Sequence, residues 1–214
     1  EVLLKNGSEI DAAGESEKNP LNLAISAGHK VLVEMLIDAG VELDSGDYFH
    51  LHHAVATGNQ EIVLVLIEAG VDVNRKTPNG SPPLNFTYQF LHFDMEMFDL
   101  LLTKGAVVDL SVAWMAYYSW GIAINLSDDY LKSIIKKMDD INERFPANGM
   151  IPGITLLDMV ASDEYDKDLA NFIRELGGEY SSIIWASEAG DIVAVQDFLD
   201  AGADVNMKSV DGRT

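Results

Sequence analysis

An apolar helical segment that ends at a glycine recurs along the chain at nearly constant spacing. The segments end at Gly7, Gly40, Gly70, Gly105, Met138, Gly177 and Gly202, in steps of 33, 30, 35, 33, 39 and 25 residues. Met138 is the departure from glycine and the weakest member of the series. A repeat of this length predicts a stack of small helical units, because one such unit cannot bury its apolar face alone.

Each unit reads as two helices. In the unit that ends at Gly40, a short first helix with small residues ends at Gly28, and a second helix carries an apolar stripe at helical period. That stripe is predicted to contain Val31, Leu32, Met35 and Leu36. Gly40 supplies the left-handed backbone conformation that ends the second helix. Small residues on the first helix let a neighbouring unit approach closely, so we expect the stacked pairs to curve.

The segments that connect successive units, here called fingers, carry turn residues. Asn79-Gly80 suits the positive φ angles of a tight hairpin turn. Pro82-Pro83 follows, and proline fits the first turn of a helix, where its missing N–H would be unpaired anyway. Asp211-Gly212 repeats the turn signal shortly before residue 214. We therefore expect the sequence to be cut within a repeat.

The pattern is clearest in "NPLNLAISAGHKVLVEMLIDAGVELD" and "FHLHHAVATGNQEIVLVLIEAGVDVN", and it returns in "SIIWASEAGDIVAVQDFLDAGADVN". It resembles the ankyrin repeat, whose consensus runs Thr-Pro-Leu-His-Leu-Ala-Ala, two free positions, Gly-His, a second helix, and Gly-Ala-Asp-Val-Asn. The resemblance implies an all-α solenoid of stacked helix-turn-helix units joined by β-hairpin fingers, about seven units in this chain.

The resemblance also suggests how the chain is divided. Residues 1–180 are expected to form ankyrin repeats, of which the first is incomplete and the fourth to sixth are divergent. Residues 181–214 resemble the opening repeat of a new array, truncated at its end, because Ser181 follows the preceding glycine pair without a finger. We therefore expect a seam near Ser181, with a bend or a second array.

Composition limits the classes of partner. The chain has 35 acidic and 14 basic residues and a formal net charge of −21, which repels nucleic acid and anionic membranes. The acidity suits a solvated surface, or a partner with a basic surface. The chain has no cysteine, no apolar run of membrane-spanning length and no signal-peptide pattern, so we expect a cytoplasmic location. We also expect the chain to be a monomer.

No group of residues points to catalysis, a cofactor or a metal. The stretch His50, His52, His53 contains common metal ligands, but His52 falls on the histidine position of the ankyrin motif. Asn22, Asn85 and Asp158 take that position in other repeats, which favours a shared role in bracing a turn. Ser127 is predicted to cap a helix whose first turn contains Asp128 and Asp129.

Aromatic and methionine residues concentrate between Phe86 and Trp120. They suit either the core between two repeats or an exposed interface, and the sequence leaves both open. Two helical registers also fit residues 111–126 about equally well.

The resemblance implies where a partner would bind, because ankyrin arrays use the finger tips and the two free positions late in each first helix. The candidate partner-binding residues are Ser26, Ala56, Thr57, Pro78, Asn79, Gln89, Phe90, Tyr117, Tyr118, Asp163 and Glu188. We expect them to form one continuous strip with an aromatic centre at Phe90, Tyr117 and Tyr118.

The sequence thus predicts a non-catalytic scaffold that binds a partner protein through its concave face and finger tips. The alternative is a targeting arm of a longer enzyme, effector or toxin whose catalytic domain lies outside these residues. A third possibility, an acidic mimic of DNA, requires acids arranged in a double row.

Overall fold

The computed structural model describes residues 19–43, 49–89, 92–122, 127–145, 153–162 and 167–208. Its contacts divide the chain into two compact units. Unit 1 comprises Glu1–Val107 and Gly121–Asn125, and unit 2 comprises Val108–Trp120 and Leu126–Thr214. Both units are built mainly from pairs of helices, so the predicted all-α repeat architecture is confirmed.

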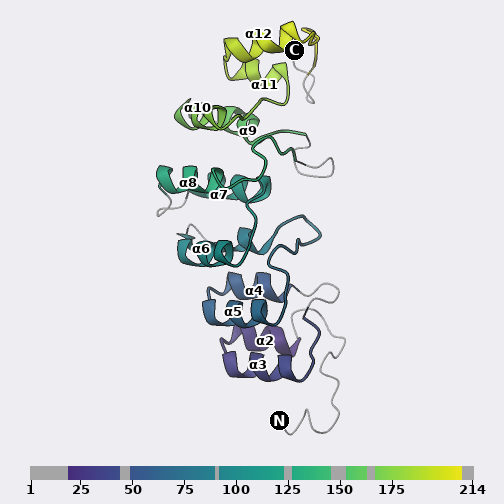
Figure 1. Cartoon of the computed structure of the whole chain (residues 1–214), viewed down its shortest axis with the longest axis vertical. Helices are drawn as coiled ribbons and strands as arrows, with labels where there is room; N and C mark the ends of the chain where they lie inside the picture. The colour runs from purple at the N-terminus through teal and green to yellow at the C-terminus, as the bar shows by residue number, and fades with distance from the viewer. Residues whose placement is uncertain are drawn as a thin grey trace. The chain divides into compact units, whose positions relative to one another are not determined.

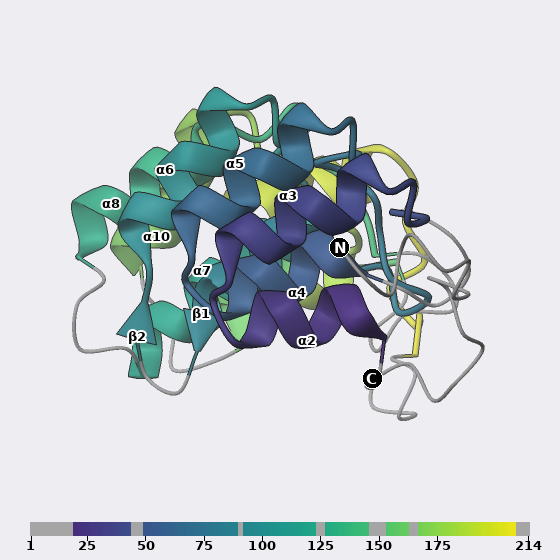
Figure 2. The same cartoon turned by 90° about the horizontal axis from the view of Figure 1, so that it is seen from below.

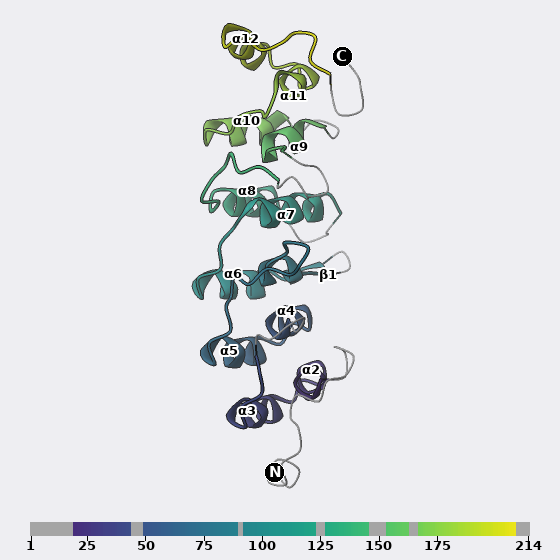
Figure 3. The same ribbon diagram turned by 90° about the vertical axis from the view of Figure 1, so that its right-hand side faces the viewer.

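Two regular helix pairs begin the described part of unit 1. The first pair is α2 (Pro20–Ser26) with α3 (Lys30–Asp38), and the second is α4 (His50–Ala56) with α5 (Gln60–Glu68). The first helix α2 packs against α4, and the second helix α3 packs against α5 (Figure 1). Successive pairs therefore lie side by side, with first helices in one layer and second helices in another (Figure 3).

The third repeat of unit 1 departs from the regular pair. Its first element is the 3₁₀ helix η2 (Pro83–Thr87), which packs against α4. The antiparallel strands β1 (Tyr88–Gln89) and β2 (His92–Phe93) follow, before the regular second helix α6 (Met95–Thr103) (Figure 2). The Thr87 hydroxyl donates to the Leu84 carbonyl and the Thr87 carbonyl accepts from Asp94, both at 2.8 Å. Because these bonds end the helical segment at Thr87, Gln89 lies in β1. The prediction that Gln89 lies late in a first helix was wrong.

Unit 2 contains three further pairs. They are α7 (Leu110–Ile122) with α8 (Asp128–Ile135), α9 (Leu156–Ser162) with α10 (Lys167–Glu175), and α11 (Ile183–Glu188) with α12 (Ile192–Asp200). Helix α10 contacts α8, and α11 packs against α9. The repeat after residue 180 therefore stacks on its predecessor within one unit, and the seam expected near Ser181 stays a prediction.

Most second helices end at the glycines that the sequence pattern marked, and side-chain caps fix where several of them begin. Asn59 caps α5 by accepting the Ile62 N–H at 3.1 Å, and Gly70 ends the helix with φ +95°. The predicted cap at Ser127 is confirmed, because its hydroxyl accepts the Tyr130 N–H at 3.3 Å. Met138 stands where the other repeats have glycine, and α8 ends early, at Ile135. A residue with a side chain rarely adopts the left-handed conformation that a glycine provides there.

The buried core of both units is largely aliphatic, and its largest fully buried side chains are Leu21, Ile25, Leu51, Ile62, Leu66, Leu84, Met97, Phe98, Leu101, Leu110, Leu131 and Ile134. In α3 the buried residues are Val33 and Leu36, whereas Val31 and Leu32 are exposed. The predicted stripe on this helix was therefore rotated by about one residue.

The predicted β-hairpin character of the fingers is not confirmed. The finger after α5 does contain a tight turn, because Gly80 donates to the Thr77 carbonyl at 2.8 Å and Thr77 donates to the Ser81 carbonyl at 3.0 Å. In the described residues of the fingers, the recorded strand-type pairing is one isolated parallel bridge between Val108 and Met138.

Candidate functional site

The predicted contact residues of the first two repeats lie at the ends of α2 and α4. Ser26 and Thr57 are exposed, and Ala56 is half-buried. The Ser26 hydroxyl donates to the Asn22 carbonyl and the Thr57 hydroxyl to the Ala54 carbonyl, both at 2.8 Å. Since each hydroxyl bonds its own helix backbone, these positions present a small and locally ordered surface.

A polar seam joins α2 to α4 beneath that surface. The His50 Nδ1 atom lies 2.7 Å from the Asn22 Oδ1 atom, and the His53 Nε2 atom lies 2.6 Å from the Ser26 hydroxyl. Because the single Ser26 proton goes to the Asn22 carbonyl, the His53 Nε2–H must be the donor in the second bond. Burial lowers the pKa of the His53 imidazole and so favours its neutral form.

The turns between the paired helices of unit 1 form an open hollow. It is lined by Gly28, Lys30, Thr57, Gly58, Asn59, Gln60, Glu61 and Glu96. Lys30 lies 3.5 Å from Glu61, and the Gln60 amide donates to Glu96 at 3.5 Å, so each pair links one repeat to the next. Each pair joins the first residue of one second helix to the second residue of the next second helix. The sequence analysis did not identify these links, although polar residues recur at these two positions.

The finger tip at Pro78 and Asn79 is exposed, as a contact site requires. Its base is braced by His52, whose Nε2 atom lies 3.2 Å from the Ser81 carbonyl. The His52 ring also meets Phe49 and Phe86 edge to face. These contacts agree with the bracing role predicted for His52.

Asp158 braces unit 2 from the same motif position. Its carboxylate accepts the Thr155 N–H at 2.8 Å and the Ser181 N–H at 3.0 Å. The Thr155 hydroxyl donates to the Glu179 carbonyl at 2.9 Å. These bonds tie α9 to the segment that leads into α11, and they explain why a buried carboxylate is tolerated there.

The structure describes only some residues of the predicted strip and of its aromatic centre. Phe90 and Asp163 lie outside the described residues, and of Gln89 the structure describes only the backbone in β1. Tyr118 is 53% exposed, whereas Tyr117 is buried, with 9% exposed. Tyr117 as an exposed anchor was therefore wrong.

The burial pattern of α7 explains why Tyr117 is buried and Tyr118 is exposed. In α2 the buried residues are Leu21, Ala24 and Ile25. The same spacing recurs in α7 at Ala113, Ala116 and Tyr117. Tyr117 therefore corresponds to the core residue Ile25, and Tyr118 corresponds to the exposed Ser26. The Trp114 ring lies 5.9 Å from the Tyr118 ring and supports it from one turn earlier in the helix.

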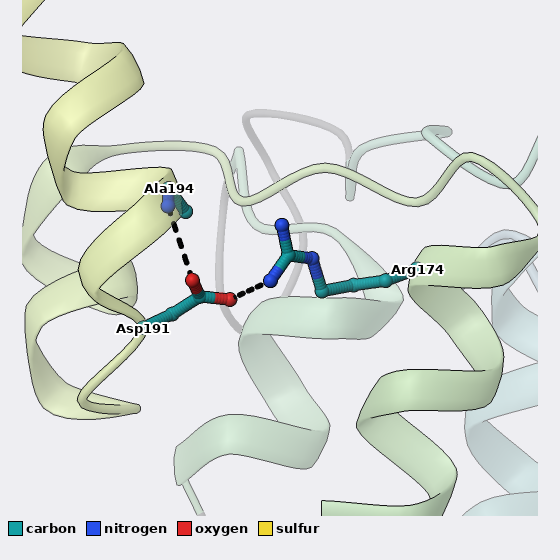
Figure 4. Close-up of polar contacts among 3 residues, drawn as sticks. All are labelled: Arg174, Asp191 and Ala194. Atoms are coloured by element: carbon teal, nitrogen blue, oxygen red, sulfur yellow. Dashed lines mark hydrogen bonds and ion pairs between the residues drawn. The ribbon is translucent and has the colours of Figure 1, made fainter.

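Glu188 lies exposed at the end of α11, next to a turn that is fixed from both sides. Asp191 caps α12 by accepting the Ala194 N–H at 3.0 Å, and its other oxygen accepts from the Arg174 guanidinium of the preceding repeat (Figure 4). The end of α11 is therefore a defined surface element of unit 2.

Neither a metal centre nor a membrane span is found in the described ranges. No three His, Asp or Glu side chains gather there closely enough to hold a metal ion. Within the same ranges, no helix combines the length and apolarity needed to cross a membrane.

Comparison with known proteins agrees with the helix pairs of unit 1. Residues 1–77 match the family model described as ankyrin repeats (3 copies). This range includes α2 to α5 and the start of the finger that follows them. No curated protein matched the chain.

Proposed function

We propose that the chain binds a partner protein through the exposed ends of its first helices and its finger tips, because residues 1–77 match the ankyrin-repeat family model. Ankyrin repeats are generally protein-interaction modules. In unit 1 the binding surface comprises Ser26, Ala56, Thr57, Pro78 and Asn79. In unit 2 it comprises Tyr118 and Glu188. Gln89 and Phe90 in unit 1 and Asp163 in unit 2 are further candidates.

The exposure of Tyr118 carries the proposal. The Tyr118 ring is 53% exposed and occupies the position where α2 has the small residue Ser26, so a partner that covered it would bury a large apolar area. Trp114 restricts the ring, so little side-chain entropy is lost when a partner covers it. Tyrosine in such a setting is typical of the residues that dominate protein interfaces.

The charge of the chain indicates which partner would be favoured. A net charge of −21 attracts a protein with a basic surface and accelerates its association. Such a complex should weaken as salt rises from about 50 to 500 mM, because the Debye length falls over that range. A complex whose affinity did not change with salt would argue against a basic partner.

A capture experiment with matched variants tests the role of Tyr118. The immobilised chain, Tyr118→Ala and Leu176→Ala are compared for retention of proteins from extract, and each variant is first shown to unfold at the wild-type temperature. Leu176 is an exposed apolar residue in the turn after α10, so it controls for general loss of apolar surface. A protein retained by wild type and Leu176→Ala but lost with Tyr118→Ala supports the proposal. Equal retention by all three would refute it.

The proposed interaction needs no catalytic group, cofactor or metal, and we propose that the chain acts as a monomer in the cytoplasm. The alternative role, a targeting arm for a catalytic domain outside these residues, uses the same binding surface and stays a prediction.

A further inference from the structure

Two second helices of unit 2 meet through two lysines and one aromatic ring. Helix α10 packs against α8, and it carries the half-buried side chain of Phe172. The Lys132 ammonium lies 5.6 Å from the centroid of the Phe172 ring, and the Lys136 ammonium lies 5.4 Å from it. Both distances suit a cation–π interaction. We call Lys132, Lys136 and Phe172 the lysine–phenylalanine patch.

The charge at this place is reversed relative to other repeats. Lys136 stands two residues before the anchor Met138, and Lys132 lies one turn earlier on the same face of the helix. The residue two positions before the anchor is acidic in four other repeats, at Asp38, Glu68, Glu175 and Asp200. Because the chain has 14 basic and 35 acidic residues, its general composition does not account for two lysines here.

The two ammonium groups of the patch are not neutralised by a carboxylate. Arg174 also bridges two repeats, and it pairs with Asp191. Lys132 and Lys136 meet a ring instead, and no carboxylate in the described ranges lies within ion-pair distance of either ammonium. A ring attracts a cation but does not cancel its charge, so the two ammonium groups still repel each other. An anion bound beside both of them would relieve this repulsion.

The surroundings of the patch favour a carboxylate over a phosphate. Each ammonium has three N–H groups and can bond an anion while it stays over the ring. The guanidinium of Arg174, a group suited to bidentate binding of phosphate, is engaged with Asp191. The carbonyl end of α8 lies at Lys136, and the exposed Asp139 and Glu175 are close in sequence to the patch. Their negative charge opposes a doubly charged phosphate more strongly than a single carboxylate.

The charge of the whole chain limits the size of the anion. A net charge of −21 repels nucleic acid and anionic membranes, which would extend beyond the patch. A short segment responds mainly to the charges beside it, because the Debye length is about 8 Å at physiological ionic strength. We propose that the lysine–phenylalanine patch binds a short acidic segment of a partner protein, with carboxylates on Lys132 and Lys136 and an apolar side chain against Phe172. The patch lies on second helices, so it is separate from the proposed partner-binding surface and does not depend on it.

Binding of a labelled peptide tests this proposal. The probe has the sequence Gly-Glu-Glu-Leu-Glu-Glu-Gly and carries an uncharged dye, and its counterpart has glutamine in place of every glutamate. Fluorescence anisotropy is measured with the full 214-residue chain at constant ionic strength. We expect the acidic peptide to bind about 4- to 25-fold more tightly than the glutamine peptide, as two exposed ion pairs give.

Matched variants separate the patch from the general charge of the chain. Lys132→Gln and Lys136→Gln should each weaken binding of the acidic peptide about 2- to 5-fold, whereas Lys136→Arg keeps the charge and should change it less than about twofold. Lys137→Gln is the control, because Lys137 is exposed and lies outside the patch. It should also change binding less than about twofold. Tyr118→Ala should leave peptide binding unchanged, so this test and the test of the partner-binding surface can fail separately.

Several results would overturn the proposal. The first is equal binding of the acidic and glutamine peptides, and the second is an equal effect of Lys136→Gln and Lys137→Gln. Displacement of the peptide by an equal concentration of inorganic phosphate, or tighter binding of a single-stranded DNA of the same charge, would show a different ligand. A lower melting temperature in Lys132→Gln and Lys136→Gln with unchanged peptide binding would show that these lysines only stabilise the contact between α8 and α10.

Discussion

The Asn74 side chain donates to the Gly105 carbonyl and accepts the Val107 N–H, a pair of bonds between repeats that is called the asparagine clamp below. This clamp makes a quantitative prediction for Asn74→Asp. Aspartate is nearly isosteric and can still accept the Val107 N–H, but it cannot donate to the Gly105 carbonyl, which Asn74 contacts at 3.0 Å. A lost hydrogen bond of this kind costs about 0.5–1.5 kcal/mol. The new carboxylate also lies next to Asp72, which adds a few tenths of a kcal/mol of like-charge repulsion. We expect a total loss of about 1–2 kcal/mol in the free energy of unfolding.

Thermal and urea unfolding measure this loss, and Asn206→Asp is the matched control. A loss of about 1–2 kcal/mol corresponds to a fall of about 2–8 °C in the melting temperature of a chain of this size. Asn206→Asp introduces the same charge beside Asp204 but removes no clamp among the described residues, so its effect should stay within about 0.5 kcal/mol. If the two variants lost the same stability, charge rather than the clamp would explain the effect, and the reasoning would fail.

Three further predictions concern single side chains. Burial lowers the pKa of His53 in the folded chain, so below about pH 6.5 the unfolded chain binds the proton more readily and the free energy of unfolding decreases as the pH is lowered. Between pH 7.5 and 5.5, urea unfolding should show a smaller decrease in this free energy for His53→Asn than for wild type. An equal decrease in both would contradict this origin. Tyr117→Ala should cost about 3–5 kcal/mol as a truncated core ring, whereas Tyr118→Ala should cost less than about 1 kcal/mol, and equal losses would contradict the assigned register. Asp191→Asn keeps the cap on α12 and removes only the charge opposite the partly exposed Arg174, so it should lower the free energy of unfolding by less than about 1 kcal/mol. Asp191→Ala also removes the cap and should lower it by about 0.5–2 kcal/mol more. Calorimetry that found Asp191→Asn less stable than Asp191→Ala would count against this assignment.

The sequence was sufficient to predict the repeat architecture, because its strongest signals are local. The anchors Gly40, Gly70 and Gly105 all adopt positive φ in the structure, and a glycine after an apolar helix marks its end whatever packs against it. Ser127 was predictable for the same reason, since a cap acts within one turn of the helix.

The register of α7 could not be predicted in this way. Trp114, Tyr117 and Tyr118 are all large and apolar enough for either the core or an interface, so no single polar face marked the outside of the helix. The choice depends on which residues the neighbouring helices cover, and that is a property of the packing. The exposed ring was therefore assigned correctly to Tyr118 and wrongly to Tyr117.

The third repeat shows a related limit. Its segment keeps the Pro-Leu start of the motif, and Leu84 is buried. The chain then bonds Asp94 back to Thr87, a contact between residues seven apart that no helical or strand period reports. Two short strands replace the end of the first helix, and Gln89 consequently lies in β1.

The residue four positions after an anchor is one source of hydrogen bonds between a repeat and the next. Asparagine at positions 74 and 142 both donates and accepts, and it clamps the following turn. Asp109 can only accept, and it caps α7 through the Val112 N–H at 3.1 Å instead. Ser181 also lacks a clamp, but there Asp158 and the Arg174 pair supply other bonds between repeats, so the chain continues as one unit. The clamp therefore reinforces stacking where it occurs, and other polar contacts can replace it.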